Sequence, residues 1–421
     1  MLEGLEISEI TFQALLKYTL SSRMDAEYFK KEYLHEDKLL SKKVCKSLVN
    51  VTKKIDVGFV GSMTSFYRES GITLLQTKNI INSSDIIIIA ANEDVINPFY
   101  LTAFLNSQLG VNQMIRFASG GLQGHVNLTI IEELEVPILE KGFQKRIEDL
   151  VQLSYSFKTQ SFQKYQEVEN LLLETIGLNN FQPCTDPVNV KSFKDSFMVT
   201  GRLDAEYYQK KYEEVVNHIT TQKYDRLANI VNIKKSIEPG SDVYSDEGLP
   251  FIRVSDFNKF GLSEPDKKLA PSFCKENAEQ LAKLKPKKET ILFSKNGSIN
   301  TAYMLRSDKD FITSGAILHL TVKDKKQIIP EYLTLALNSK LVQMQAERDA
   351  GGSIILHWRI GEIENVVVPI IDYKKQEQIA ALVDESFSLK KQSEQLLEKA
   401  KRAVEIAIEQ DEQAALDFIN S

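Results

Sequence analysis

The residues of this sequence that are best suited to chemistry are cationic side chains gathered in one stretch. Between residues 259 and 295 there are nine lysines and only five acidic residues, the lysines being Lys259, Lys267, Lys268, Lys275, Lys283, Lys285, Lys287, Lys288 and Lys295. Ammonium groups at this density can hold an anionic partner, although a lysine-rich surface is more often simply solvated. The whole chain carries a formal net charge of −6, so any basic surface must be local.

Residues that could make or break covalent bonds are sparse. The five histidines are scattered, and Cys45, Cys184 and Cys274 lie far apart, without the spacing of a zinc site. The sequence has neither a Gly-rich loop between a strand and a helix nor a P-loop. The segment 97–100, Asn-Pro-Phe-Tyr, resembles the Asn-Pro-Pro-Tyr loop of amino-methyltransferases, but the second proline is missing. We therefore expect no catalytic residues, no metal and no cofactor.

Most of the chain is a tandem repeat, which assigns the candidate residues to two related domains. The segment Arg23–Phe29 returns as Arg202–Tyr208, at an offset of about 179 residues. Further on, Pro98–Ser107 returns as Pro330–Ser339 at an offset of about 232 residues, and proline is favoured at the first position of a helix. Repeated identities at these spacings indicate two copies of one unit.

Each copy ends in a long amphipathic segment. Apolar or small residues recur in a heptad rhythm from Gln144 to Leu178 and again from Gln376 to about Gln410. This rhythm predicts two helices of about 35 residues, each roughly 50 Å long. Neither apolar stripe can remain exposed to water, so we predict that the two helices pack against each other. Antiparallel packing follows because the intervening domain carries the chain back to its starting end.

The second copy holds about 55 residues that the first copy lacks, roughly Asn258–Ala316. This extra segment contains a predicted helix, Cys274–Leu284, and two β-rich runs that flank Lys295-Asn296-Gly297-Ser298. An Asn-Gly pair between two such runs predicts a β-hairpin with a tight turn. Most of the lysine-rich stretch lies in this segment, so the two domains differ in the number of groups available for binding.

Together these pieces resemble the specificity subunits of type I restriction-modification systems. The resemblance covers nearly the whole chain, and it rests on the alternation of globular domains with long helices and on the Arg-x-Asp-Ala-Glu-Tyr repeat. Its most specific pieces are Leu249–Asp256, the Ile291–Ala302 hairpin and Pro369–Gln378. The fold it implies is α+β, with two globular target recognition domains in tandem repeat and two long helices that separate them and form an antiparallel coiled coil.

The resemblance also implies boundaries and partners. Residues 1–143 would form a shortened first target recognition domain, 144–180 a central spacer helix, 181–375 the second target recognition domain and 376–421 a distal spacer helix. The expected partners are double-stranded DNA with a split recognition site, two methyltransferase (modification) subunits, and a restriction and translocase subunit. We expect a cytoplasmic protein without a membrane partner, since the sequence shows neither an export signal nor a long apolar run.

Base reading requires side chains on strand ends and turns that can reach the edges of a DNA groove, with cations beside them for phosphates. The resemblance then points to the following candidates: in the second domain Arg253, Ser255, Asp256, Asn258, Lys259, Lys295, Asn296, Ser298, Asn300, Ser353, His357 and Arg359, and in the first Gln76, Lys78, Asn79 and His125. Each of them could equally be a surface residue in an ion pair, and the two histidines could be buried residues that hold a turn.

Two other functions fit parts of the sequence. One is a catalytic N6-adenine DNA methyltransferase, suggested by the segment 97–100, and the other is a coiled-coil scaffold whose globular domains bind proteins. If the chain reads DNA, the 55-residue difference predicts that the second domain supplies most of the sequence specificity. Compensation by the Gly58–Gly71 loop of the first domain is the contrary possibility.

Overall fold

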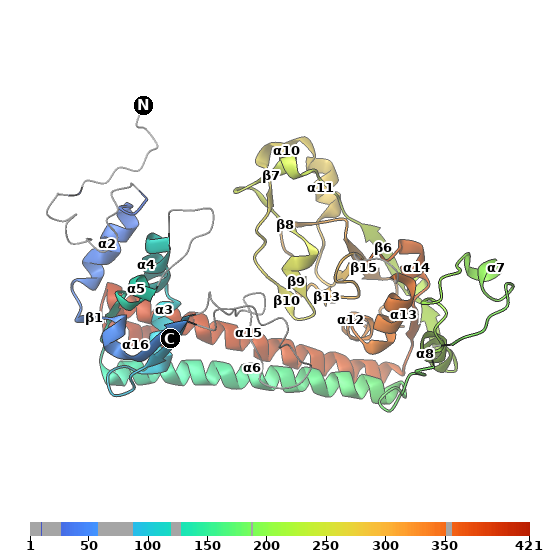
Figure 1. The fold of residues 1–421 in the computed structure, drawn as a ribbon, viewed down its shortest axis with the longest axis horizontal. Coiled ribbons are helices and arrows are strands. Elements are labelled where there is room, and N and C mark those ends of the chain that lie inside the picture. Colours follow the sequence, from blue (N-terminus) through green and yellow to red (C-terminus); the bar gives the residue numbers. More distant parts are fainter. Residues whose placement is uncertain (1–9, 11–26, 58–86, 119–127, 187, 351–355) are drawn as a thin grey trace. The chain divides into compact units, whose positions relative to one another are not determined.

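The computed structural model describes residues 10, 27–57, 87–118, 128–186, 188–350 and 356–421. The chain forms two compact units (Figure 1), of which the first comprises residues 1–159 with 389–421 and the second residues 160–388. Helices and small sheets are mixed in both units, as expected for the α+β class. Within the described ranges, none of the helices combines the length and the apolar content that a bilayer crossing requires.

The first unit places helices around two short strand pairs. β1 (Cys45–Ser47) pairs antiparallel with β4 (Glu135–Pro137), and β2 (Thr52–Val57) pairs antiparallel with β3 (Ile87–Ala91). The shorter helices of this unit are α2 (Lys31–Leu40), η2 (Leu48–Val51), α3 (Pro98–Leu105), α4 (Gln108–Ala118), α5 (Leu128–Glu132) and α16 (Glu412–Asn420).

The second unit contains two four-stranded sheets. One has the order β13-β12-β15-β6 and the other the order β14-β8-β11-β7, while β16 pairs with β5 and β10 with β9. The strands are β5 (Tyr224–Arg226), β6 (Val231–Lys235), β7 (Tyr244–Ser245), β8 (Leu249–Ile252), β9 (Phe257–Asn258), β10 (Gly261–Leu262), β11 (Lys268–Leu269), β12 (Ile291–Ser294), β13 (Ala302–Met304), β14 (Ile312–Thr313), β15 (Ile317–Val322) and β16 (Val367–Pro369).

The helices of the second unit lie between and beside these strands. Two of them, α10 and α11, fall where the sequence predicts a single helix, Cys274–Leu284. The helices are α7 (Phe197–Thr200), α8 (Lys210–Thr220), α9 (Leu227–Ile230), η5 (Ser241–Val243), η6 (Val254–Asp256), α10 (Pro271–Glu276), α11 (Ala278–Leu284), α12 (Pro330–Leu337), α13 (Lys340–Ala350) and α14 (Ile360–Glu364).

The repeat in the sequence is also a repeat of contacts. In the first unit the buried Tyr100 hydroxyl donates to the Pro137 carbonyl at 2.8 Å, and in the second the Tyr332 hydroxyl donates to the Pro369 carbonyl at 2.7 Å. The strand pairs correspond in the same way, since β1 meets β4 and β5 meets β16 at matching positions. Each copy therefore builds the same core around a tyrosine and a proline.

A buried glutamine joins each long helix to the Pro-led helix of its copy. The Gln144 Oε1 accepts from the backbone N–H of Asn97 at 2.8 Å, and the Gln376 Oε1 accepts from that of Ile329 at 2.9 Å. The side chain of Asn97 caps α3 by accepting from the backbone N–H groups of Phe99 and Tyr100. The Asn-Pro-Phe-Tyr segment is thus a capped helix start, as the repeat predicts, and not the base-clasping loop of a methyltransferase.

The long helices are α6 (Lys141–Thr175) and α15 (Tyr373–Glu409), and both begin three residues before the predicted start. α6 ends before Gly177, whose φ of +72° is a conformation that glycine adopts at little cost. The predicted distal segment 376–421 is not one helix. It breaks after Glu409, and the Asp411 side chain caps the separate helix α16 by accepting from the Ala414 N–H at 2.8 Å.

Serine pairs lie in the contact between α6 and α15. In the first unit the buried Ser154 hydroxyl donates to the Ser393 carbonyl at 2.8 Å, and in the second the Ser386 hydroxyl donates to the Ser161 carbonyl at 2.8 Å. The heptad rhythm of the segments Gln144–Leu178 and Gln376–Gln410 places all four serines at positions of the apolar and small stripe. The heptad pattern missed several other buried side chains of these helices, namely Val151, Tyr165, Leu172, Val383 and Val404.

Glu36 on α2 makes the stability of the first unit depend on pH. Burial raises the pKa of its carboxyl group from 4.5 to about 7, although the Asn112 amide donates to it at 2.7 Å. Because this pKa is raised, the folded chain holds a proton that the unfolded chain releases, and stability falls as the pH rises from about 4.5 to about 7.

We therefore expect Glu36→Gln to stabilise the first unit at pH 8 by about 1 to 2 kcal/mol, a value reduced because the carboxyl group is only half-buried. At pH 5 the variant should match the parent. Urea unfolding at both pH values measures this, with the exposed Glu32→Gln as the control. An equal effect of Glu36→Gln at the two pH values would contradict the assignment.

Candidate nucleic-acid interface

The centre of the candidate interface is a turn between two strands of the second unit. β12 and β13 form an antiparallel hairpin in which Phe293 lies opposite Ala302, so the predicted hairpin is present. The connection runs over residues 295–301 and is longer than the predicted tight turn. Gly297 and Asn300 reverse the chain with φ values of +71° and +66°. A longer turn presents more backbone and side-chain groups to a partner than a two-residue turn would.

This turn is paired with the chain around His357. Asn296 forms an antiparallel bridge with His357, and the Gly297 N–H donates to the Leu356 carbonyl at 3.0 Å. On the other side the Trp358 N–H donates to the Lys295 carbonyl at 2.8 Å. Two groups of predicted residues that lie sixty positions apart in the sequence therefore meet. We call residues 295–298 with 356–359 the recognition turn.

The recognition turn exposes groups that can donate and accept hydrogen bonds. Ser298, His357 and Arg359 are exposed, and Lys295 and Asn296 are partly exposed. The Lys295 ammonium donates to the Asn296 Oδ1 at 3.2 Å. Amide, ammonium and guanidinium groups make hydrogen bonds to base edges, and an imidazole can both donate and accept, so this cluster has suitable chemistry for direct readout.

A second cation lies close to Lys295. Burial and the charge of Lys235 lower the pKa of Lys295, while the nearby Glu238 acts in the opposite direction. Lys235 ends β6 and was missed in the sequence analysis, where only the Lys-Lys pair at the end of a strand could have indicated it. An anion bound between the two ammonium groups would relieve their repulsion, as a DNA phosphate could.

The Arg253 to Asp256 segment forms a turn of its own. β8 ends at Ile252 because the Asp256 carboxylate accepts from the Arg253 N–H at 2.8 Å and closes the helical turn η6. Asp256 is buried and also accepts from the Ser255 hydroxyl at 2.8 Å. The Arg253 guanidinium pairs with Asp256 and with Asp266, at 3.6 and 3.3 Å. Asp256 therefore builds the turn, and Arg253 is held beside it.

Three other candidates are bound to neighbouring residues. The Lys259 ammonium pairs with Glu169 of α6 at 2.6 Å and lies 4.7 Å from the centre of the Tyr165 ring. The Asn258 side chain accepts from the N–H of Phe260 at 2.8 Å. The side-chain nitrogen of Asn300 donates to the Leu337 carbonyl at 2.9 Å, and its side-chain oxygen accepts from the Gln343 N–H at 3.2 Å. Lys259 and Asn300 therefore connect distant parts of the unit, and Asn258 stabilises a local turn.

Five predicted residues fall outside the described part of the chain. They are Gln76, Lys78, Asn79 and His125 of the first copy and Ser353 of the second. Over the ranges that the structure does describe, no group of three or more His, Cys, Asp or Glu side chains is arranged to hold a metal ion.

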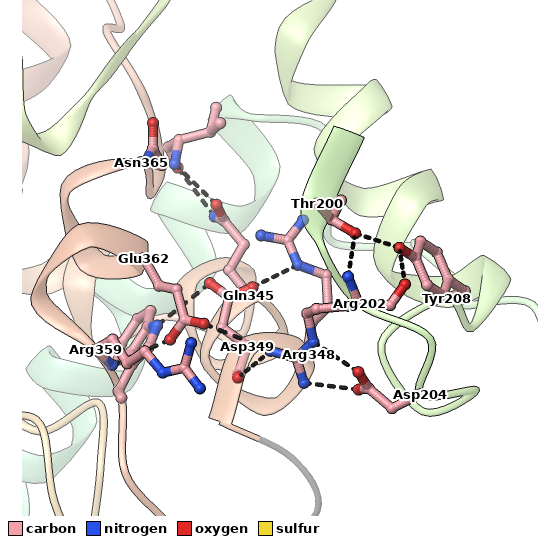
Figure 2. Close-up of polar contacts among 12 residues, drawn as sticks. Thr200, Arg202, Asp204, Tyr208, Gln345, Arg348, Asp349, Arg359, Glu362 and Asn365 are labelled. Carbon is pink, nitrogen blue, oxygen red and sulfur yellow. Dashed lines mark hydrogen bonds and ion pairs between the residues drawn. The ribbon is translucent and has the colours of Figure 1, made fainter. Parts of the chain in front are cut away.

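The repeated Arg-x-Asp-Ala-Glu-Tyr segment lies against α13 and α14 of the second unit (Figure 2). The Arg202 guanidinium makes a bidentate pair with Asp204, at 2.8 and 2.6 Å, and its Nη1 donates to the Asp349 carbonyl at 2.8 Å. Arg202 and Arg348 also lie over the Tyr207 ring, at 4.5 and 5.1 Å from its centre. The repeated segment therefore fixes the end of α13, from which the chain leads to the recognition turn.

Comparison with protein-family models finds a match that covers most of the second unit. Residues 221–399 match the family model described as "Type I restriction modification DNA specificity domain". The matched range includes the recognition turn, both four-stranded sheets and part of α15. No curated protein is significantly similar to the chain.

Several solved structures are also similar, at low identity. The HsdS subunit from Thermoanaerobacter tengcongensis shows 16% identity and a TM-score of 0.30, over 80% of this chain and 74% of that one. The type I restriction-modification S subunit from M. genitalium shows 12% identity and a TM-score of 0.36, over 89% and 95% of the two chains. Because these TM-scores are below 0.5, the assignment rests on the family model. That match agrees with the resemblance that the repeated motifs carry, and it shows that residues 221–399 are similar to the DNA specificity domain of type I restriction-modification systems.

Proposed function

We propose that the chain is a non-catalytic subunit that reads a split site in double-stranded DNA and docks two methyltransferase subunits, which a restriction and translocase subunit joins in the full enzyme. The observation that carries the DNA-reading role is the pairing of Asn296 with His357 inside the matched specificity domain. Lys295, Ser298 and Arg359 lie in the same recognition turn and supply further hydrogen-bonding and cationic groups.

We further propose that α6 and α15 form an antiparallel coiled coil that acts as the spacer between two target recognition domains. The buried hydroxyl contacts of Ser154 with Ser393 and of Ser161 with Ser386 support this pairing, as does the 3.6 Å ion pair between Lys164 and Glu385. Small residues in the seam allow the backbones of the two helices to approach closely. Under this proposal, unread bases would separate the two half-sites.

The two domains should contribute unequally to specificity. In the second unit β6 and β15 pair, and the chain between them, residues 236–316, holds the strands β7 to β14. In the first unit the corresponding strands β2 and β3 are joined by residues 58–86 only. We propose that the second domain supplies most of the discrimination between sequences, because it has more groups available for base contacts.

The contacts that globular residues make with the long helices also differ between the two units. In the second unit Phe260 packs on Tyr165 with 4.8 Å between ring centres, and Arg306 lies 4.1 Å from the centre of the Phe387 ring. The cavity that remains beside Tyr165 and Phe387 is only about 10 Å³. The equivalent surface of the first unit, around Tyr155, is a hollow of about 390 Å³, and Tyr155 is 53% exposed. Among the described residues of the first unit, none takes the place of these contacts.

Methyl-transfer assays on the purified chain separate this function from the methyltransferase alternative. With the methyl donor and plasmid DNA, we expect no methylation by the chain alone and clear methylation once the methyltransferase subunits are added. DNA affinity of the complex should fall steeply with salt, since phosphate contacts release counterions. Methylation by the chain alone would refute the proposal, and DNA affinity that does not respond to salt would favour the scaffold alternative.

A further inference from the structure

Trp358, the one tryptophan of the sequence, belongs to the recognition turn, and its side chain is buried. It is 1% exposed, its ring packs 5.7 Å from that of Phe293, and its backbone N–H donates to the Lys295 carbonyl. The residue before it is His357, which bridges Asn296. The position of the indole ring therefore sets where both sides of the recognition turn lie.

The indole N–H of Trp358 is held by a buried carboxylate. It donates to the Asp349 Oδ2 at 3.2 Å, and Asp349 is itself only 6% exposed. The other carboxylate oxygen accepts from the Arg348 Nε at 2.8 Å, while the Asp349 carbonyl accepts from Arg202 (Figure 2). Asp349 thus connects the fixed end of α13 to the ring that supports the recognition turn.

The first copy of the repeat has the same contact of an arginine with a tyrosine ring, but its sequence has neither the aspartate nor the tryptophan. Arg116, the counterpart of Arg348, lies 4.3 Å from the centre of the Tyr28 ring and pairs with Asp37 at 2.9 Å. At the offset of 232, however, Asp349 corresponds to Phe117, and Trp358 corresponds to a valine at position 126. The arginine on a tyrosine ring is therefore common to both copies, whereas the Asp-Trp pair belongs to the second copy, whose recognition turn it supports.

We propose that Asp349 is a positioning residue for sequence reading, which acts through the Trp358 indole to fix the geometry of the recognition turn. This inference rests on the proposed DNA-reading function. Base contacts require side chains held within about 0.5 Å of their binding geometry. Contacts to the phosphate chain add affinity but carry no sequence information directly. Loss of the Asp349 link should therefore reduce the preference for the correct sequence much more than it reduces general affinity for DNA.

The test compares two variants in the full chain, alone and with the methyltransferase subunits. Asp349→Asn removes the charge that holds Arg348, and Trp358→Phe keeps an aromatic ring and removes the N–H donor. The probes are a 40-base-pair duplex containing the site that the complex methylates and a scrambled duplex of the same composition. We expect each variant to lower the affinity ratio of the two duplexes about 10-fold, as the loss of one good base contact would. Affinity for the scrambled duplex should change less than about twofold.

Three controls separate positioning from misfolding. The affinity ratio of the double variant should be no lower than the lower of the two single-variant ratios, because both changes break the same Asp349–Trp358 hydrogen bond. Asp37→Asn, the matched change in the first copy, should leave the ratio unchanged. In the Asp349→Asn chain, Trp358 fluorescence should still resist quenching by iodide if the unit remains folded.

The outcomes are distinct. An unchanged ratio in Asp349→Asn, or an equal loss of affinity for both duplexes, would overturn the positioning role while leaving the DNA-reading function intact. A parent complex that does not distinguish the two duplexes would refute the proposed function, and the inference would fall with it.

Discussion

Replacing Asn296 and His357 together by alanine is expected to lower the rate at which the assembled complex methylates its own site by about 10- to 100-fold. The two residues face each other across the recognition turn, and each base contact contributes about 1 to 3 kcal/mol of discrimination. Methylation kinetics on a duplex that carries the mapped site, with saturating methyl donor, measure the effect. General DNA binding should persist, because Lys235, Lys295 and Arg359 remain.

The matched control changes the same residue types in the first unit. Asn50 and His35 are exposed, and alanine at both positions should leave the methylation rate within about twofold of the parent rate. An Asn296 and His357 double variant that methylates its site at the parent rate would remove the recognition turn from the reading surface. Methylation of new sites at an undiminished rate would instead show that these residues select the sequence without adding to affinity.

The second large effect concerns stability. Gln376→Ala should destabilise the second unit by about 3 to 5 kcal/mol, because the side chain is completely buried and its loss leaves the Ile329 N–H and the carbonyls of Gln327 and Ile371 without a partner. The cavity left by the shortened side chain adds to this cost. Thermal or urea unfolding, monitored by the fluorescence of Trp358 in the second unit, reports the change directly.

Two further variants make this prediction specific. Gln144→Ala breaks the corresponding contacts in the first unit and should leave the unfolding of the second unit, as reported by Trp358, nearly unchanged. Gln378 is exposed on α15, and its replacement by alanine should change stability by less than about 0.5 kcal/mol. If Gln376→Ala is as stable as Gln378→Ala, the buried glutamine does not join the long helix to the Pro-led helix as described.

The parts of the fold that could be predicted are those coded by short-range patterns. Heptad spacing located both long helices to within three residues at their starts, and proline at the first helical position located α3 and α12. The Asn-Gly pair indicated the β12–β13 hairpin. Its longer connection depends on the positive φ of Asn300, and no residue pattern in the sequence signals this conformation.

The candidate site was harder to predict because the role of each residue depends on partners that are distant in sequence. Lys259 and Lys295 are equivalent in a list of lysines, yet the first is paired with Glu169, ninety residues earlier, and the second lies near Lys235. The role of Trp358 depends on Asp349 and on the Lys295 carbonyl, and neither contact follows from periodicity or composition. Sequence patterns named most of the recognition turn but not the residues that hold it in place.

Genome-wide mapping of modified adenines in cells that carry this chain with its methyltransferase subunits tests the central claim most directly. We predict a split site in which one half-site is well defined and the other is short or degenerate, and alanine at Asn296 and His357 should alter the defined half. Two half-sites of equal information content, or modification that does not depend on this chain, would contradict the account.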